Sequence, residues 1–197
     1  WKMLFLGVLF GLYTAAVVYA LGSFLEERFP HEETPFYTAF FSSAGVEEAV
    51  KFLFLFFLIW GNRNFNEPLD GIVYGVFVSL GFAWAENVIY VTHPILGGYE
   101  TAFARALLSV PGHGLFGVRM GYYFALGKYR SRKRYLPLAF FSPYLAHALY
   151  NYFLLKREPV FWLFFSVLEA RLWVFGLKRI KELQNCSPFR EKVSKES

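Results

Sequence analysis

The sequence predicts an all-α fold, a polytopic transmembrane helical bundle of about six spans. Hydrophobic residues make up 56% of the 197 residues, and the mean hydropathy is +0.35, which exceeds what is usual for a soluble domain. A spanning helix needs roughly 20 mostly apolar residues, and the chain contains a series of such runs with short polar connections. We therefore expect one transmembrane domain over residues 1–184 and a short polar C-terminal tail over residues 185–197.

The charges between the apolar runs indicate how the first spans are oriented. The predicted spans cover residues 3–25, 36–60, 69–91, 101–126, 136–155 and 159–177. The first span ends in an acidic loop with few positive charges, which places that loop outside the cytoplasm. The second span ends at a polar turn that begins with Gly61, which we place inside, and the third is closed by His93 and Pro94.

The remaining connections contain the basic residues. The fourth span ends at a dense basic cluster between Lys128 and Arg134, and a tail rich in lysine follows the sixth. Cytoplasmic loops carry an excess of lysine and arginine, so we expect a multi-pass protein of the cell membrane with both termini in the cytoplasm. The net charge of +5 is concentrated in these anchors, which argues against nucleic acid as a partner. The single cysteine, Cys186, excludes a cysteine-rich metal site.

One cluster of ionisable residues interrupts the second span. An ionisable side chain costs at least ~2.5 kcal/mol near the centre of a membrane helix, so those that are present are usually paired, hydrated or functional. Glu47 and Lys51 are four residues apart and share a helix face, so the lysine can neutralise that carboxylate. Glu48 is expected to point roughly 100° away from Glu47.

Two further clusters lie in the third and fourth spans. Glu86 and Asn87 are adjacent, and a carboxylate in apolar surroundings suits a general base or acid. His113 lies within residues 111–114, where proline and glycine are expected to loosen the helix and leave backbone groups free for water or a peptide.

A fourth cluster lies in the fifth span, where His147 and Asn151 are four residues apart and share a face. At 1.5 Å per residue, Glu47, Glu86, His113 and His147 all lie very roughly 10–18 Å from the outer end of their spans. This agreement in depth predicts one shared site in the outer half of the membrane.

Other features are expected to be structural. Glycine pairs spaced four apart should allow close helix packing; they are Gly7 with Gly11, Gly71 with Gly75, and Gly117 with Gly121. Arg119, Glu169 and Arg171 also lie in apolar runs, and we assign them to ion pairing, snorkelling or packing.

The polar clusters resemble the motifs of a known family. Residues 47–51 match an EExxK motif and residues 82–87 match FxxxEN, while His113 and the pair of His147 and Asn151 supply the remaining positions. Together they resemble the PrsW family of intramembrane proteases, which is related to CAAX-prenyl proteases and bacteriocin-processing enzymes. The wider superfamily more often has arginine and histidine where this chain has Lys51 and Glu86, which favours PrsW.

The resemblance implies an intramembrane endopeptidase, with residues 1–184 as its protease domain. Its substrate would be a membrane-anchored protein, such as an anti-sigma factor, cut near the extracytoplasmic side. The residues expected to be catalytic are Glu47, Glu48, Glu86, His113 and His147, supported by Lys51, Asn87 and Asn151.

Two mechanisms fit these residues. In the first, Glu47 or Glu86 acts as general base on a water molecule, while His113 and His147 polarise the carbonyl. In the second, Glu86, His113 and His147 hold a divalent metal such as zinc, although the HExxH spacing is absent. The resemblance to the wider superfamily favours the metal-independent mechanism, so we predict no firm cofactor.

Two other classes of function use similar residues. Carboxylates and histidines in membrane helices also form the ion relays of proton-coupled transporters, but no inverted repeat is evident. A membrane scaffold that holds a partner helix without cutting it would be compatible with the glycine pairs. The sequence makes no prediction of the oligomeric state.

Overall fold

The computed structural model describes residues 1–29, 34–95, 97–130 and 134–189, which are helical with no strand among them. The elements are α1 (Lys2–Arg28), α2 (Pro35–Tyr37), the π-helix η1 (Thr38–Gly45), α3 (Val46–Ile59), α4 (Pro68–Thr92), α5 (Tyr99–Leu107), α6 (Ser109–Tyr129), α7 (Tyr135–Lys156) and α8 (Pro159–Asn185). The all-α prediction is therefore confirmed.

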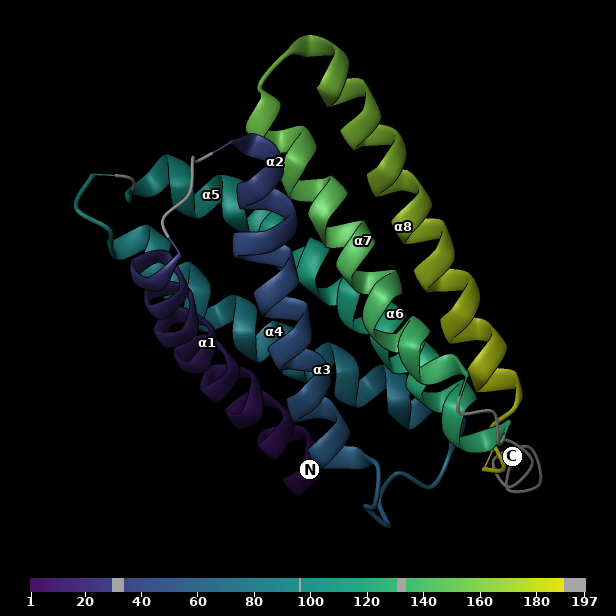
Figure 1. The fold of residues 1–197 in the computed structure, drawn as a ribbon. Helices are drawn as coiled ribbons and strands as arrows, with labels where there is room; N and C mark the ends of the chain where they lie inside the picture. The colour runs from purple at the N-terminus through teal and green to yellow at the C-terminus, as the bar shows by residue number, and fades with distance from the viewer. Residues whose placement is uncertain (30–33, 96, 131–133, 190–197) are drawn as a thin grey trace.

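The long helices run back and forth between two ends of the bundle (Figure 1). The start of α1 and the end of α8 lie at the same end, and α2 and α5 lie towards the other. Helix α4 packs most extensively, against α1 on one side and α6 on the other. Helix α7 packs against α6 and η1, and α8 covers the outside of α6 and α7.

Three of the described helices, α1, α4 and α8, are long and apolar enough to cross a membrane. The other passes are shorter or more polar. Helix α3 alone has only 14 residues, and α6 contains both His113 and Arg119. The chain is a helical membrane protein whose apolar helices are packed together with passes that carry polar groups.

The predicted glycine pairs lie where helices cross closely. A Cβ atom added to Gly117 of α6 would lie 2.6 Å from the carbonyl oxygen of Gly75 on α4, so no larger residue fits without a shift. Gly71 and Gly121 face each other one turn further along. Gly11 of α1 meets the backbone of α4 in the same way. Close packing through small residues is thus confirmed at all three pairs.

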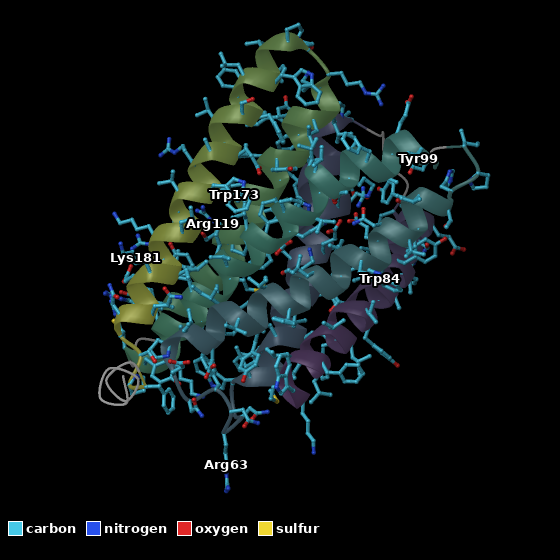
Figure 2. The ribbon with its side chains drawn as sticks, turned by 180° about the vertical axis from the view of Figure 1, so that it is seen from behind. Arg63, Trp84, Tyr99, Arg119, Trp173 and Lys181 are labelled. Atoms are coloured by element: carbon cyan, nitrogen blue, oxygen red, sulfur yellow. The ribbon has the colours of Figure 1, made fainter. Side chains whose placement is uncertain are left out.

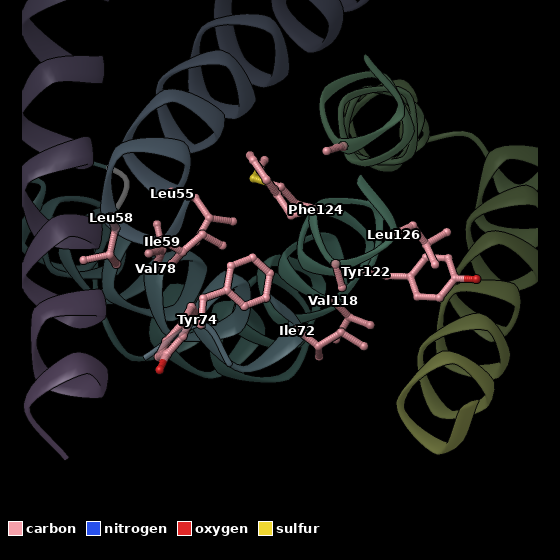
Figure 3. Packing of buried hydrophobic residues seen from close by; sticks show 14 of the residues in the cluster. Leu55, Leu58, Ile59, Ile72, Tyr74, Val78, Val118, Tyr122, Phe124 and Leu126 are labelled. Carbon is pink, nitrogen blue, oxygen red and sulfur yellow. The ribbon is translucent and has the colours of Figure 1, made fainter. Parts of the chain in front are cut away.

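Buried hydrophobic side chains fix the relative positions of α3, α4 and α6 (Figure 3). Leu55 and Ile59 of α3 pack with Val78 of α4 and with Val118 and Phe124 of α6. These residues are almost completely buried. This core lies beside the polar clusters along α3, α4 and α6, and therefore holds the three helices in a constant arrangement.

The prediction of one continuous helix over residues 101–126 is wrong, because the chain breaks at Leu108 between α5 and α6. The expected loosening at residues 111–114 is also wrong, since that segment is helical. Pro111 explains the break. Its ring clashes with the carbonyl of Leu107, four residues earlier, and it has no N–H for that carbonyl, so the break occurs one turn before the proline.

The span predicted over residues 36–60 consists of three elements, because η1 interrupts regular α geometry ahead of α3. A π-helix has wider turns than an α-helix and is frequently found at functional sites. The last predicted span also differs, since α8 continues beyond residue 177 to Asn185. Residues 190–197 of that tail lie outside the described part of the chain.

Candidate functional site

The site is built around the buried ammonium of Lys51 on α3. Its Nζ lies 2.9 Å from Oε1 of Glu48 and 3.4 Å from Oε2 of Glu47. The same atom lies 3.2 Å from Nδ1 of His113 and 3.9 Å from the centre of the Phe82 ring. The expected pairing with Glu47 is confirmed, and the lysine also contacts Glu48, which lies about 100° around the helix from Glu47. Residues three apart on a helix are also neighbours, so Lys51 reaches both carboxylates.

His147 of α7 joins this cluster through its two ring nitrogens. Nδ1 lies 2.9 Å from Oε1 of Glu48, and Nε2 lies 3.1 Å from Nδ2 of Asn151, which confirms their shared face. Because the amide of Asn151 is a donor, Nε2 accepts, and the ring proton belongs on Nδ1, where it is donated to Glu48. A carboxylate in this position fixes both the tautomer and the orientation of an imidazole.

Glu86 of α4 holds the other histidine. Its Oε2 lies 2.9 Å from Nε2 of His113 on α6, and Nη2 of Arg105 donates to the same oxygen at 2.7 Å. The two imidazole rings lie edge to face, with centres 5.1 Å apart. Since Lys51 occupies Nδ1 of His113 as a donor, the proton of that ring belongs on Nε2, facing Glu86.

Arg105 of α5 was not identified from the sequence. It donates to Oδ1 of Asn87 at 2.5 Å and to Oγ of Ser109 at 3.0 Å, and its guanidinium lies over the ring of Tyr90. Among the described residues, it is this arginine that connects Asn87 to the site. An arginine within an apolar run is itself a signal of pairing or function, so Arg105 could have been found on that ground.

Ser43 of η1 is a second residue that sequence reasoning missed. Its hydroxyl donates to Oε1 of Glu47 at 2.9 Å and accepts from the amide of Asn151 at 2.9 Å. Ser43 therefore connects the carboxylates of α3 to the pair on α7. No signal in the sequence pointed to it, because a serine in an apolar run is common in membrane helices.

Two cavities meet at this cluster. One, of about 300 Å³, lies between α4, α5, α6 and α7 and is lined by Glu86, His113, His147 and Asn151. The other, of about 340 Å³, lies between α1, η1 and α4 and is lined by Glu47 and Glu86. Glu86 and Ser43 line both. The polar cluster is therefore accessible from two sides, and Glu86 is the carboxylate common to them.

Four buried residues also lie close enough together to hold a metal ion. Glu47, Glu48, His113 and His147 each offer one ligand atom, and these atoms lie within 4.8 Å of one another. Imidazole and carboxylate are ligands that zinc accepts, and Oε2 of Glu48 is buried with no hydrogen-bond partner among the described residues. The ligand types therefore fit a divalent ion, which would displace the contacts that Lys51 and Asn151 make with the two imidazoles. The set expected from the sequence differs, since Glu86 lies on the far side of His113.

The structure brings all of the expected site residues into one hydrogen-bonded network, drawn from α3, α4, α6 and α7. The contacts between His147 and Glu48, between Lys51 and His113, and between His113 and Glu86 connect the four helices. The prediction of one shared site is confirmed by these contacts. The chemical role of each residue stays a prediction.

Comparisons with known proteins agree with the resemblance seen in the motifs. A family model described as "PrsW family intramembrane metalloprotease" matches residues 1–175. A protein described as "Protease PrsW" from Geobacillus kaustophilus is 41% identical over 152 residues, which are 76% of this chain and 65% of that protein. Its counterpart from Oceanobacillus iheyensis is 38% identical over 182 residues, 91% of this chain and 80% of that protein.

A third relative extends this similarity to Bacillus subtilis strain 168, whose "Protease PrsW" is 37% identical over 154 residues, 76% of this chain and 68% of that protein. The chain thus spans slightly less than two thirds of the Geobacillus protein. No solved structure is significantly similar to this chain. Relatives described as proteases favour the peptidase over the transporter and the scaffold.

Proposed function

The chain belongs to the PrsW family of intramembrane metalloproteases, and on this basis we propose that it hydrolyses a peptide bond of a membrane-anchored protein within the bilayer. Its family membership confirms the resemblance inferred from the motifs. The observation that carries the proposal is the junction of two cavities at a buried cluster of glutamates and histidines. A peptide and a water molecule can approach such a cluster from different sides.

Glu86 is the proposed general base. A base must be reached by water, and the side chain of Glu86 is 18% exposed, compared with 7% for Glu47 and none for Glu48. Arg105 and His113 both contact its Oε2 and so hold the carboxylate in place. Glu86 would accept a proton from water as the oxygen attacks the carbonyl carbon of the scissile bond.

His147 and Asn151 are proposed to polarise the carbonyl oxygen, together with His113. All three line the 300 Å³ cavity in which Glu86 also lies. In the resting network their N–H groups are donated to Glu48, Glu86, Ser43 and His147 itself, so a second ring proton or a redirected amide hydrogen would supply the donor that stabilises the oxyanion. Glu48 holds His147 from the opposite side, so the ring cannot turn away from the cavity.

The description of the family favours the metal-dependent mechanism over the metal-independent one that we preferred from the sequence. Glu47, Glu48, His113 and His147 are the residues that would hold the ion. A bound zinc ion would polarise the carbonyl and lower the pKa of a water molecule. Lys51 contacts three of these four residues and so keeps positive charge beside the carboxylates.

The substrate is proposed to be cut near the extracytoplasmic side, and an anti-sigma factor is the candidate that the resemblance implies. Lys2 begins α1, Lys128 lies in the last turn of α6 and Lys181 lies near the end of α8, and these helix ends are at the end of the bundle where the chain starts (Figure 1). The positive-inside rule places that end in the cytoplasm. Glu86 and His113 lie towards the opposite ends of α4 and α6, which supports a site in the outer half.

The test is cleavage of candidate membrane-anchored anti-sigma factors by the purified protein in detergent, with products mapped by mass spectrometry. We expect Glu86→Gln and His147→Ala to abolish cleavage while the helical circular dichroism spectrum is retained. Glu169→Gln, a change at a membrane carboxylate of α8 outside the site, should cleave normally. A chelator should stop cleavage and added zinc should restore it.

The outcomes separate the alternatives. Cleavage that resists the chelator but is lost in Glu86→Gln would support the metal-independent mechanism. Cleavage that survives both active-site changes would show that the network is structural and would refute the proposal.

A further inference from the structure

Two arginines in apolar helices have no role in the proposed chemistry. Arg119 of α6 donates from Nε to Oγ of Ser142 at 3.0 Å and lies 4.4 Å from the ring of Phe175. Arg171 lies on α8 and is exposed. Among the described residues, no carboxylate forms an ion pair with either guanidinium, so the ion pairing considered from the sequence is not found. The nearby Glu169 instead accepts from the indole of Trp173 on its own helix.

Both arginines line two adjoining cavities. The larger, of about 530 Å³, lies between α6, α7 and α8, and most of its other lining residues are apolar. The second, of about 460 Å³, is lined by the same two arginines together with Lys178 and Arg179. Figure 2 shows Arg119 beside the middle of the α8 ribbon, near Trp173, while Lys181 lies further towards the end of that helix. An apolar groove therefore leads into a basic one.

A guanidinium in hydrocarbon needs an anion or water to compensate its charge. Arg179 already has an anion, because its Nη1 donates to Glu182 at 2.5 Å. Arg119, Arg171 and Lys178 have none among the described residues. Arg119 and Arg171 lie seven and six residues, or about 10 Å, inside the predicted span ends at residues 126 and 177, so their long side chains can extend towards a lipid phosphate at the interface, whose oxygens the planar arginine fork binds in pairs.

We propose that the groove formed by α6, α7 and α8 binds an anionic phospholipid. Its phosphate contacts Arg119, Arg171 and Lys178, and one acyl chain occupies the apolar cavity beside Leu145 and Leu168. Free phosphate would leave this apolar part unfilled, and an uncharged apolar helix would leave the cations without a partner. The combination of basic and apolar surfaces therefore fits a phospholipid.

The lipid site is separate from the peptidase site, and the proposal does not depend on proteolysis. The two sites share α7, on which Ala146 and Leu149 line the lipid groove while His147 and Asn151 line the site cavity. A bound lipid would therefore brace α7 from its outer face. We expect it to raise the temperature at which the purified protein unfolds.

The experiment is native mass spectrometry of the delipidated protein in detergent, titrated with phosphatidylglycerol or with phosphatidylcholine. We expect tighter binding of phosphatidylglycerol, and a loss of about fivefold in its affinity for each of Arg171→Gln and Lys178→Gln, since one basic residue near a lipid phosphate contributes about that factor. Both residues are exposed, so these variants should fold. Lys181→Gln, on the same helix but outside both cavities, is the matched control.

Further measurements show whether the groove binds a phospholipid, free phosphate or a protein segment. Inorganic phosphate at millimolar concentration should not displace the lipid. Arg119→Gln, if it folds, should also weaken the binding of phosphatidylglycerol. Equal binding of the two lipids, equal losses in Lys181→Gln and Arg171→Gln, or displacement by inorganic phosphate would each overturn the proposal. Displacement of phosphatidylglycerol by the membrane segment of a cleaved substrate would also overturn it, because the groove would then be a docking site for protein.

Discussion

Replacing Lys51 with methionine is expected to destabilise the protein strongly, because the ammonium is the shared counter-ion of two buried carboxylates. The attraction at 2.9 Å to Glu48 and at 3.4 Å to Glu47 amounts to about 6 and 5 kcal/mol at an effective dielectric constant of 20. The cost of removing the three charges from water offsets most of this attraction. Removing the lysine alone leaves that burial cost uncompensated, so we expect a net loss of about 3–5 kcal/mol.

The assay is thermal unfolding in detergent, followed by far-ultraviolet circular dichroism in the presence of a chelator, so that no metal replaces the missing charge. For a chain of this length, each kcal/mol corresponds to about 2–4 °C, which predicts a decrease of about 6–20 °C for Lys51→Met. The double variant Lys51→Met/Glu48→Gln should recover part of this loss, because it removes one of the unpaired carboxylates. Lys181→Met, on the exposed face of α8, should unfold like the wild type.

A Lys51→Met protein that unfolds within about 2 °C of the wild type would refute this reasoning, given that a loss of 3 kcal/mol should shift the midpoint by at least about 6 °C. A double variant less stable than Lys51→Met alone would also refute it. The carboxylates would then be protonated or hydrated in the absence of the lysine, and the network would not be an ionic one.

Three further predictions concern the surroundings of the site. Gly117→Ala should lower stability by about 1–3 kcal/mol in the same assay, because its Cβ would overlap the backbone of α4, whereas Gly22→Ala, which meets open space, should not. Arg105→Gln should lower kcat/KM about 10- to 100-fold in the cleavage assay with the fold retained, reflecting the loss of hydrogen bonds to a charged group. Tyr150→Phe removes the donor to the carbonyl of Leu108 at the α5–α6 break, and should cost about 1 kcal/mol in thermal unfolding.

The polar clusters could be located from the sequence because charge in a membrane helix is rare and costly, and therefore conspicuous. Spacing within one helix was equally informative, and it correctly paired Glu47 with Lys51 and His147 with Asn151. Depth in the bilayer also predicted that polar residues of separate helices would meet, because residues at the same depth in neighbouring spans can contact one another. The bounds of α1, α4 and α7 agree with the apolar runs to within a few residues for the same reason.

The rotation of one helix about its axis relative to the next could not be predicted in this way. It depends on the glycine contacts between α4 and α6 and on the π turns of η1. The sequence pattern does not show which way these features turn a helix about its axis. Ser43 lies on η1, and its contacts with Glu47 and Asn151 depend on this rotation. The metal-ligand set expected from the sequence, with Glu86 in it, differed from the geometric one for the same reason, as depth alone does not say which side of His113 a carboxylate lies on.

The pairing of Lys51 with residues three and four positions earlier on its own helix has a consequence for biosynthesis. Glu48 and His147 are 99 positions apart, so at roughly 5–20 residues per second the carboxylate is synthesised about 5–20 s before its partner on α7. During that interval α3 already carries its own counter-ion and can enter the lipid with much of its charge neutralised. Insertion of the isolated segment over residues 36–60 should accordingly be less efficient with Lys51→Met, and equal efficiency would contradict this account. Until α7 is inserted, a nascent chain would hold the carboxylates of α3 in the bilayer without His147, and would therefore be inactive.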